Sequence, residues 1–325
     1  GNLAFPGGRM DPGDRPDEPG AHRRCASREL REETGLAVDP EAWVEAGARI
    51  TPPLFPVRFR TEFFVAIGPG DGLAGTPPSP ENDWLGFLTP GEVVERWRSG
   101  SAALAPPVLA ILRALLDREP APDDDADAIA EIVRATNQVE ERAPRIEFVP
   151  DIWVVPVKTW TLPPATHTNV WMPGGARFVV VDPGSDDAVE LERLGRVIRR
   201  RLDGGARAEA VVLTHHHQDH VPGAPVIARD LGVPVAAHAE VLDRVSAIVG
   251  DVPTRVLEPG QIVDLGGITL HAVLTEGHAP GHLAFLVPER RALLSGDLVS
   301  ALSTMLIDPG TGDMGSTAVT VWGNQ

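Results

Sequence analysis

Residues 215–220 hold four imidazoles and one carboxylate, in the order His-His-His-Gln-Asp-His. Imidazole nitrogen suits zinc and related transition metals, and carboxylate oxygen extends the same ligand set. The spacing His-x-His-x-Asp-His differs from that of a helical pair and suits a tight loop that turns alternate side chains inward. We therefore expect His215 and His217 to serve one metal, and Asp219 and His220 to serve a second.

Two later segments carry further donors of the same kinds. His278 lies in a Gly/Pro-rich turn, Thr275–His282, which follows an apolar run, and Asp297 ends another apolar run. A carboxylate at such a strand end can bridge two metals. His282, in the same turn as His278, is expected to support the ligands or to face the substrate rather than to bind metal.

The elements that must position these donors follow from the apolar pattern. Phe178–Val181 is a continuous apolar run, typical of a buried strand, and stops at Asp182. A helix is predicted from Asp187 to Leu202 with Ser185 as its N-cap. Ala210–Leu213 predicts the next buried strand, which ends at the histidine cluster. Ligand sites of α/β sheets favour such strand ends, and from Ile146 onward strand and helix patterns alternate, as in a layered α/β domain.

These motifs together resemble the metallo-β-lactamase superfamily. The loop Thr214–His220, the Gly-His turn and the Ser295-Gly296-Asp297 strand end look like successive family motifs in the family's order. The resemblance covers roughly residues 145–310 and is greatest to the glyoxalase II-like and β-lactamase-like-2 branches. It implies an αββα sandwich in which Asp182 is an early structural aspartate.

The resemblance also implies a ligand set and a mechanism. His215, His217 and His278 would bind the first metal, Asp219 and His220 the second, and Asp297 would bridge them. The cofactor would be one or two zinc ions, or iron or manganese. A metal-bound hydroxide, oriented by Asp219, would attack an ester, thioester or phosphodiester. The family's final histidine has no counterpart after His282, so we expect an incomplete or altered C-terminus, with Asp308 or Asp313 as a substitute donor.

A second constellation lies near the N-terminus, where residues 28–36 read Arg-Glu-Leu-Arg-Glu-Glu-Thr-Gly-Leu. On a helix, Glu29, Glu32 and Glu33 share one face, and three like charges there repel. A bound Mg²⁺ or Mn²⁺ would remove that cost, because hard cations prefer oxygen ligands. Gly35 is placed to end the helix.

This segment resembles the end of the Nudix box of hydrolases that cleave diphosphates linked to another group. Phe5-Pro6-Gly7-Gly8 resembles its start, and Asp14 stands where the family usually has glutamate. The long gap before Arg28 is similar to the branch of peroxisomal acyl-coenzyme A diphosphatases. The resemblance implies a Nudix α/β/α sandwich over residues 1–118 that lacks its first strands. In it Glu32 and Glu33 act in catalysis and Arg28 orients the glutamates.

Composition and net charge bear on the domain organisation, binding partners and location of the whole chain. We expect an α/β chain of two domains, residues 1–118 and 144–325, joined by an acidic, proline-marked linker at residues 119–143 that continues into a short helix near Ala128–Arg134. The net charge of −17 disfavours broad nucleic-acid binding. A single cysteine fits a reducing compartment, so a cytoplasmic location is expected, and no apolar run is long enough to span a membrane.

The leading functional hypothesis is metal-dependent hydrolysis of a small-molecule substrate. Pairing a glyoxalase II-like site with an acyl-coenzyme A-type Nudix box suggests that both halves act on coenzyme A or nucleotide derivatives. Two alternatives stay open: an endoribonuclease of the β-lactamase-like type, and a non-catalytic nucleotide-binding or regulatory module with a structural metal. The sequence makes no prediction of the oligomeric state.

Overall fold

The computed structural model describes residues 2–51, 58–68, 83–121, 123–142 and 146–299, without the side chains of 137–142. The chain divides into two compact units, Gly1–Arg142 and Ala143–Gln325, called unit 1 and unit 2 below. Among the described residues, no helix has both the length and the apolar character needed to cross a membrane.

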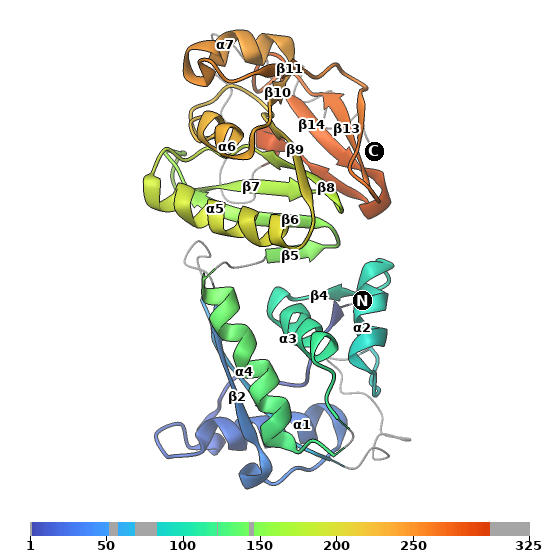
Figure 1. The fold of residues 1–325 in the computed structure, drawn as a ribbon. Helices are drawn as coiled ribbons and strands as arrows, with labels where there is room; N and C mark the ends of the chain where they lie inside the picture. The colour runs from blue at the N-terminus through green and yellow to red at the C-terminus, as the bar shows by residue number, and fades with distance from the viewer. Residues whose placement is uncertain (1, 52–57, 69–82, 122, 143–145, 300–325) are drawn as a thin grey trace. The chain divides into compact units, whose positions relative to one another are not determined.

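The described residues of unit 2 form two sheets (Figure 1). In spatial order the strands of the larger one are β11 (Thr254–Val256), β10 (Val235–Ala237), β9 (Arg207–Val212), β8 (Arg177–Val181), β7 (His167–Pro173), β6 (Ile152–Lys158) and β5 (Ile146–Val149). The smaller sheet is antiparallel and consists of β12 (Ile262–Asp264), β13 (Thr269–Leu274), β14 (Leu283–Val287) and β15 (Ala292–Leu294).

Three layers pack around two apolar cores. The helices α5 (Ala188–Asp203), α6 (Ala224–Leu231) and α7 (Ala239–Val249) cover one face of the larger sheet, and the smaller sheet covers the other (Figure 1). In β8, Phe178 and Val180 point into the helix-side core, whereas Val179 and Val181 point into the core between the sheets. Side chains alternate across a strand, so a strand buried on both faces must be apolar throughout. The described residues thus form one helix layer and two sheet layers, which are three of the four layers of the predicted αββα sandwich.

The predicted strand at 178–181 is confirmed as β8, and the strand at 210–213 lies within and just after β9. The predicted helix at 187–202 is confirmed as α5, but the prediction of Ser185 as its N-cap is wrong. The side chain of Asp187 accepts hydrogen bonds from the backbone N–H groups of residues 189 and 190, whereas Ser185 accepts from Asp187 N. A carboxylate is equally good as an N-cap, and here it stands directly before the first helical turn.

Strand direction brings the loops of interest to one edge of the larger sheet. β8, β9 and β10 run parallel, so the turn after β8 and the loop after β9 leave from the same edge. β7 is antiparallel to β8, and its first residues therefore begin at that edge too. The sequence argument from strand ends is thus consistent with the topology.

Unit 1 contains two separate two-stranded sheets among its described residues. β1 (Asn2–Leu3) pairs with β4 (Ala103–Leu104) in parallel, and β2 (Val44–Ile50) pairs with β3 (Arg60–Val65) antiparallel. Its helices are α1 (Ala21–Thr34), α2 (Pro90–Arg98), α3 (Pro106–Asp117) and α4 (Ala126–Arg142). Gly35 ends α1 with a positive φ of 76°, as predicted. The Nudix sandwich itself stays a prediction.

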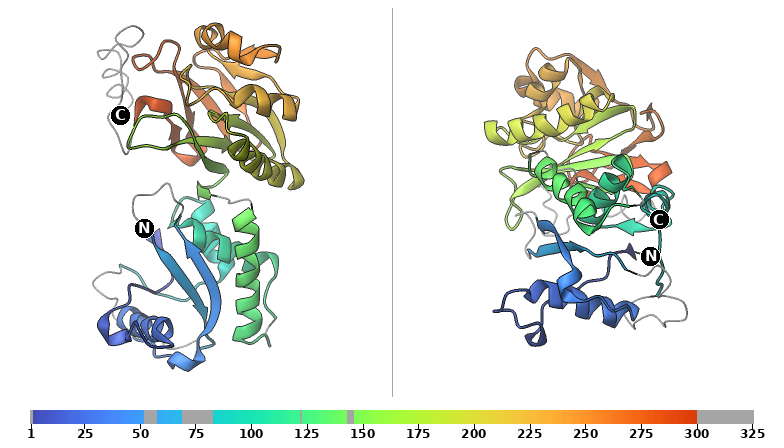
Figure 2. Two further views of the ribbon diagram at one scale, coloured as in Figure 1. Left: turned by 90° about the vertical axis from the view of Figure 1, so that its left-hand side faces the viewer. Right: turned by 60° about the horizontal axis from the view of Figure 1, so that its bottom comes forward.

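Much of the stretch predicted as a linker, 119–143, forms helix α4 of unit 1. Helix α4 lies beside β2 and α3 (Figure 2). Its residues Ala130 and Val133 pack against Ala46 of β2 and Ile111 of α3. The acidic run before the helix is solvated, but apolar residues at helical spacing follow it and need a core to pack against.

Candidate metal centre

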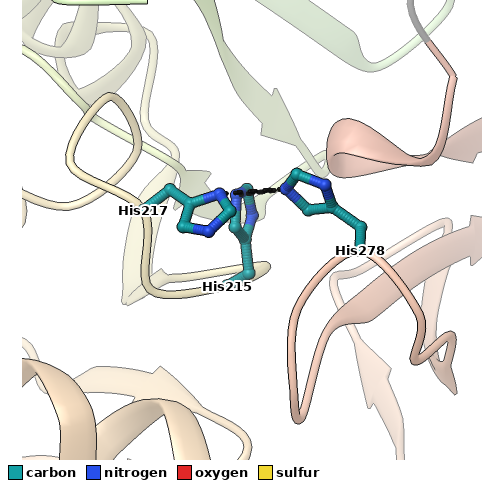
Figure 3. A group of neighbouring side chains, drawn as sticks. All are labelled: His215, His217 and His278. Carbon is teal, nitrogen blue, oxygen red and sulfur yellow. Dashed lines mark hydrogen bonds between the residues drawn. The ribbon is translucent and has the colours of Figure 1, made fainter. Parts of the chain in front are cut away.

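Three imidazoles from two loops of unit 2 converge on one point (Figure 3). His215 and His217 come from the loop after β9, and His278 comes from the loop after β13. His278 Nε2 lies 3.3 Å from His215 Nε2 and 2.9 Å from His217 Nδ1, and all three nitrogens lie within 4.8 Å of one another. Nitrogens bound tetrahedrally at about 2.0–2.1 Å from zinc are separated by about 3.3 Å. The three imidazoles therefore fit a shared divalent cation.

A second donor group adjoins the first and shares one histidine with it. Single ligand atoms of His215, His220 and Asp297 also lie within 4.8 Å of one another. His220 Nε2 lies 3.1 Å from Asp297 Oδ1, and His278 Nε2 lies 3.8 Å from Asp297 Oδ2. The carboxylate of Asp297, in the 3₁₀ turn Gly296–Leu298, thus has one oxygen beside each group, the arrangement a bridging ligand needs.

Asp219 lies at the edge of this second group. Its Oδ2 is 3.6 Å from His220 Nε2 and accepts a hydrogen bond from Thr168 Oγ1 at 3.4 Å. Asp219 is not in either group of three close donors, so the structure brings it near the second position without placing it directly on it.

The donor side chains differ in how far they are buried. His215, His220 and His278 are buried, whereas the Asp297 side chain is 40% exposed and His217 is half-buried. Asp297 and His217 are thus more exposed than the other donors of the two groups.

Asp182 lies behind the donors and is buried. Its carboxylate accepts hydrogen bonds from Thr214 N at 2.8 Å and Thr214 Oγ1 at 2.6 Å, and lies 2.9 Å from His220 Nδ1. The backbone of Asp182 has a φ of 53°, in the left-handed region that few non-glycine residues adopt. Asp182 thus holds the second-group histidine in place, as a structural aspartate would. Sequence reasoning gave no role to Thr214, which links Asp182 to the histidine loop.

A glycine allows this close approach of two loops. A Cβ on Gly184 would lie 1.7 Å from the carbonyl oxygen of Asp219. Only a residue without a side chain lets the turn after β8 pack directly against the histidine loop.

Burial and neighbouring charges set the protonation of the metal-free centre. Burial, followed by the nearby histidines, lowers the pKa of His215 well below its usual range, and burial lowers the pKa of His217 to about 4. Both rings are therefore neutral near pH 7 and carry the lone pair that a metal needs.

His220 and Asp297 form a charged pair within the centre. Burial disfavours charge on His220, but the carboxylates of Asp182 and Asp297 outweigh it and raise the pKa of His220 well above its usual range. Burial likewise opposes ionisation of Asp297, but His220 lowers the pKa of Asp297 to about 2. A cation that binds His220 must therefore displace a proton.

His282 supports the centre from behind. It is fully buried, its Nδ1 lies 2.8 Å from Thr275 Oγ1, and its Nε2 has no hydrogen-bond partner within the described part of the chain. A Cβ on Gly296 would lie 2.5 Å from that Nε2, so His282 packs directly under the turn that carries Asp297. It belongs to neither donor group.

The glutamates of unit 1 are arranged differently from the histidines of unit 2. Arg28 contacts Glu29 at 2.9 Å, Glu32 at 3.0 Å and Asp14 at 2.9 Å, while Glu33 accepts a hydrogen bond from Gly7 N at 3.3 Å. Within the described ranges of unit 1, no three donor atoms of the metal-binding residue types lie within 4.8 Å of one another. The predicted magnesium cluster is therefore not gathered, because an arginine compensates Glu29 and Glu32 where a cation was expected.

Comparisons with known proteins find relatives for part of the chain. The family described as the Metallo-beta-lactamase superfamily matches residues 163–321. The Lactamase-like protein adaB of Aspergillus niger is 33% identical over 41% of this chain and 39% of its own length. A hydroxyacylglutathione hydrolase of Acidiphilium cryptum is 32% identical over 43% of this chain and 49% of its own length. The chain thus spans less than half the length of these relatives.

Among solved structures, a metallo-beta-lactamase from Pontibacter korlensis is similar to this chain. The sequence identity is 18%, the TM-score is 0.47, and the match covers 55% of this chain and 82% of that chain. Other relatives have names that refer to thioester chemistry. One is an atrochrysone carboxyl ACP thioesterase of a Cryptosporiopsis species, which is 28% identical over 43% of this chain and 41% of its own length.

Proposed function

Because residues 163–321 match the Metallo-beta-lactamase superfamily, we propose that unit 2 is a metal-dependent hydrolase of thioesters or related esters. The observation that carries the proposal is the convergence of the His215, His217 and His278 nitrogens within 4.8 Å. Relatives named as a thioesterase and as hydroxyacylglutathione hydrolase support the choice of a thioester.

The proposed ligands of the first cation are the three-imidazole group, and those of the second include Asp219, which lies beside the second group. His215, His217 and His278 would hold a first divalent cation, with zinc or iron suited to three imidazoles. His220 and Asp219 would hold a second, and Asp297 stands beside both groups. When bound, such a cation supplies Lewis acidity and lowers the pKa of water.

Other residues of the chain would orient the reactants. Asp219 is partly exposed and lies beside His220, where its carboxylate could orient a water and accept its proton. Asp182 keeps the His220 ring fixed, and the buried His215 and His278 keep bulk water away from the rear of the centre. Fixed donors around a partly dry site stabilise developing charge better than mobile water does.

The test is hydrolysis of defined substrates by the purified full-length protein. Acyl-coenzyme A and a hydroxyacylglutathione should release free thiol, the rate should fall on chelation, and added zinc, iron or manganese should restore it. His278→Ala should abolish the reaction. His271→Ala, which replaces a histidine of β13 that is in neither donor group, should not.

Cleavage of single-stranded RNA without thiol release would instead favour an endoribonuclease. Ligand binding without turnover, retained after chelation, would favour a regulatory module.

For unit 1 we propose binding and cleavage of a coenzyme A-type or nucleoside diphosphate substrate with Mg²⁺ or Mn²⁺. The supporting observation is the hydrogen bond from Gly7 N to Glu33, which joins the two ends of the Nudix-like signature. Coenzyme A incubated with the protein and Mg²⁺ should yield phosphopantetheine, and Glu33→Gln should lose that product. If acyl-coenzyme A yields neither free thiol nor phosphopantetheine, the idea that both units act on one class of substrate is refuted.

A further inference from the structure

Thr214 lies between a buried carboxylate and a buried imidazole. Its hydroxyl donates a hydrogen bond to Asp182 Oδ2 at 2.6 Å and lies 2.9 Å from His215 Nδ1. Thr214 is 1% exposed, His215 0% and Asp182 3%. Water therefore cannot replace any of these contacts without opening the fold.

The chemistry of a hydroxyl group fixes the direction of this chain of hydrogen bonds. A threonine hydroxyl has one proton to donate, and here the carboxylate receives it. Toward His215 the hydroxyl can only accept, so His215 Nδ1 must carry a hydrogen. A neutral imidazole has one ring proton, and Nε2 of His215 is then left with a free lone pair. That atom is the one that faces His278 Nε2 at 3.3 Å.

The same carboxylate oxygen fixes a second ring. Asp182 Oδ2 lies 2.9 Å from His220 Nδ1 and can only accept there, so Nδ1 of His220 also carries a hydrogen, while its Nε2 lies 3.1 Å from Asp297 Oδ1. We propose that Thr214 is a positioning residue that locks His215 as the Nδ1–H tautomer, and that Asp182 anchors both donor groups through one oxygen atom. The inference rests on the proposed metal centre but concerns groups present in the metal-free protein.

The chain contains a matched control for this role. Thr275 is also 1% exposed, and its Oγ1 lies 2.8 Å from the Nδ1 of another buried histidine, His282. His282 belongs to neither donor group. Thr275→Val therefore removes the same kind of contact at the same depth without touching a proposed ligand.

The first experiment needs neither metal nor a variant. In the chelated wild-type protein, nitrogen-15 NMR of the histidine side chains should show His215 protonated at Nδ1. Thr214→Val should give a mixture of tautomers, and Thr214→Ser should retain the wild-type form. His215 protonated at Nε2 in the wild type would overturn the proposal, whether or not the protein binds metal.

The second experiment measures zinc affinity by competition with a chelator. Thr214→Val should weaken binding by about 10- to 100-fold, the usual effect of removing a group that orients a ligand. Thr214→Ser should retain wild-type affinity, and Thr275→Val should lose less affinity than Thr214→Val, because His282 belongs to neither donor group. Unchanged affinity in Thr214→Val, or equal losses in Thr214→Val and Thr275→Val, would overturn the positioning role. If the wild-type protein binds no zinc, the proposed function is refuted instead. The tautomer measurement then still tests the role of Thr214.

Discussion

His282 gives unit 2 a sensitivity to acid in the metal-free protein. Burial, followed by the neighbouring histidines, lowers the pKa of His282 to about 3 from an ordinary value of 6.5. Below pH 6.5 the unfolded chain binds a proton at this position and the folded chain does not. The contribution of His282 to the free energy of unfolding is therefore present at neutral pH and is lost as the pH falls toward 3. Between pH 7 and pH 5 the free energy of unfolding should drop by about 2 kcal/mol from His282 alone.

Neighbouring histidines contribute in both directions. His215 and His217, whose pKa values are also lowered, add to the loss in acid. His220 opposes it, because its raised pKa gives stability that is fully present below pH 6.5 and is lost as the pH rises through the folded value. Comparing the wild type with His282→Gln isolates the effect of His282.

The assay is urea unfolding of chelated protein at pH 7 and pH 5, followed by hydrogen exchange of peptides that contain β8 and β9. These strands lie in the core of unit 2, so their exchange reports that unit alone. His22→Gln on the exposed face of α1 is the control, because it removes one histidine without touching unit 2. If His282→Gln loses as much stability in acid as the wild type does, the reasoning is refuted.

Two further predictions concern how the site is held. Gly184→Ala would put a Cβ 1.7 Å from the carbonyl oxygen of Asp219, so the two loops must separate. We expect a loss of zinc affinity together with a lower melting temperature, and unchanged values for both would contradict the packing. Asp187→Ala removes the two cap hydrogen bonds of α5 and should destabilise unit 2 by about 1 kcal/mol. Ser185→Ala, measured in the same urea titration, should cost less, and the reverse order would contradict the cap assignment.

The sequence predicted those parts of unit 2 whose signals are local. The run Phe178–Val181 had to be a strand buried on both faces, because each of its residues faces one of two cores. The histidine loop had to begin at a strand end, and topology then brought His278 to it from another sheet. The convergence of His215, His217 and His278 was therefore predictable from the sequence, whereas their binding of a metal stays a prediction.

Features that depend on contacts distant in sequence were not predictable in the same way. Thr214 gained a role only when the turn after β8 brought Asp182 within hydrogen-bond distance. In unit 1, the like charges of Glu29 and Glu32 suggested a cation, but Arg28 lies close enough to compensate both. The acidic run at 123–125 suggested a linker with only a short helix after it, whereas α4 is longer and its apolar face packs against β2.

Metal content of the purified protein tests the central claim most directly. Elemental analysis of wild type, His278→Ala and the control His271→Ala should find at least one transition metal per chain in the wild type and the control. The His278→Ala protein should have lost the metal of the three-imidazole group, because that group loses one of its three close nitrogens. A folded wild type that retains no metal when zinc, iron or manganese is supplied, or a His278→Ala protein with full metal content, would contradict the account.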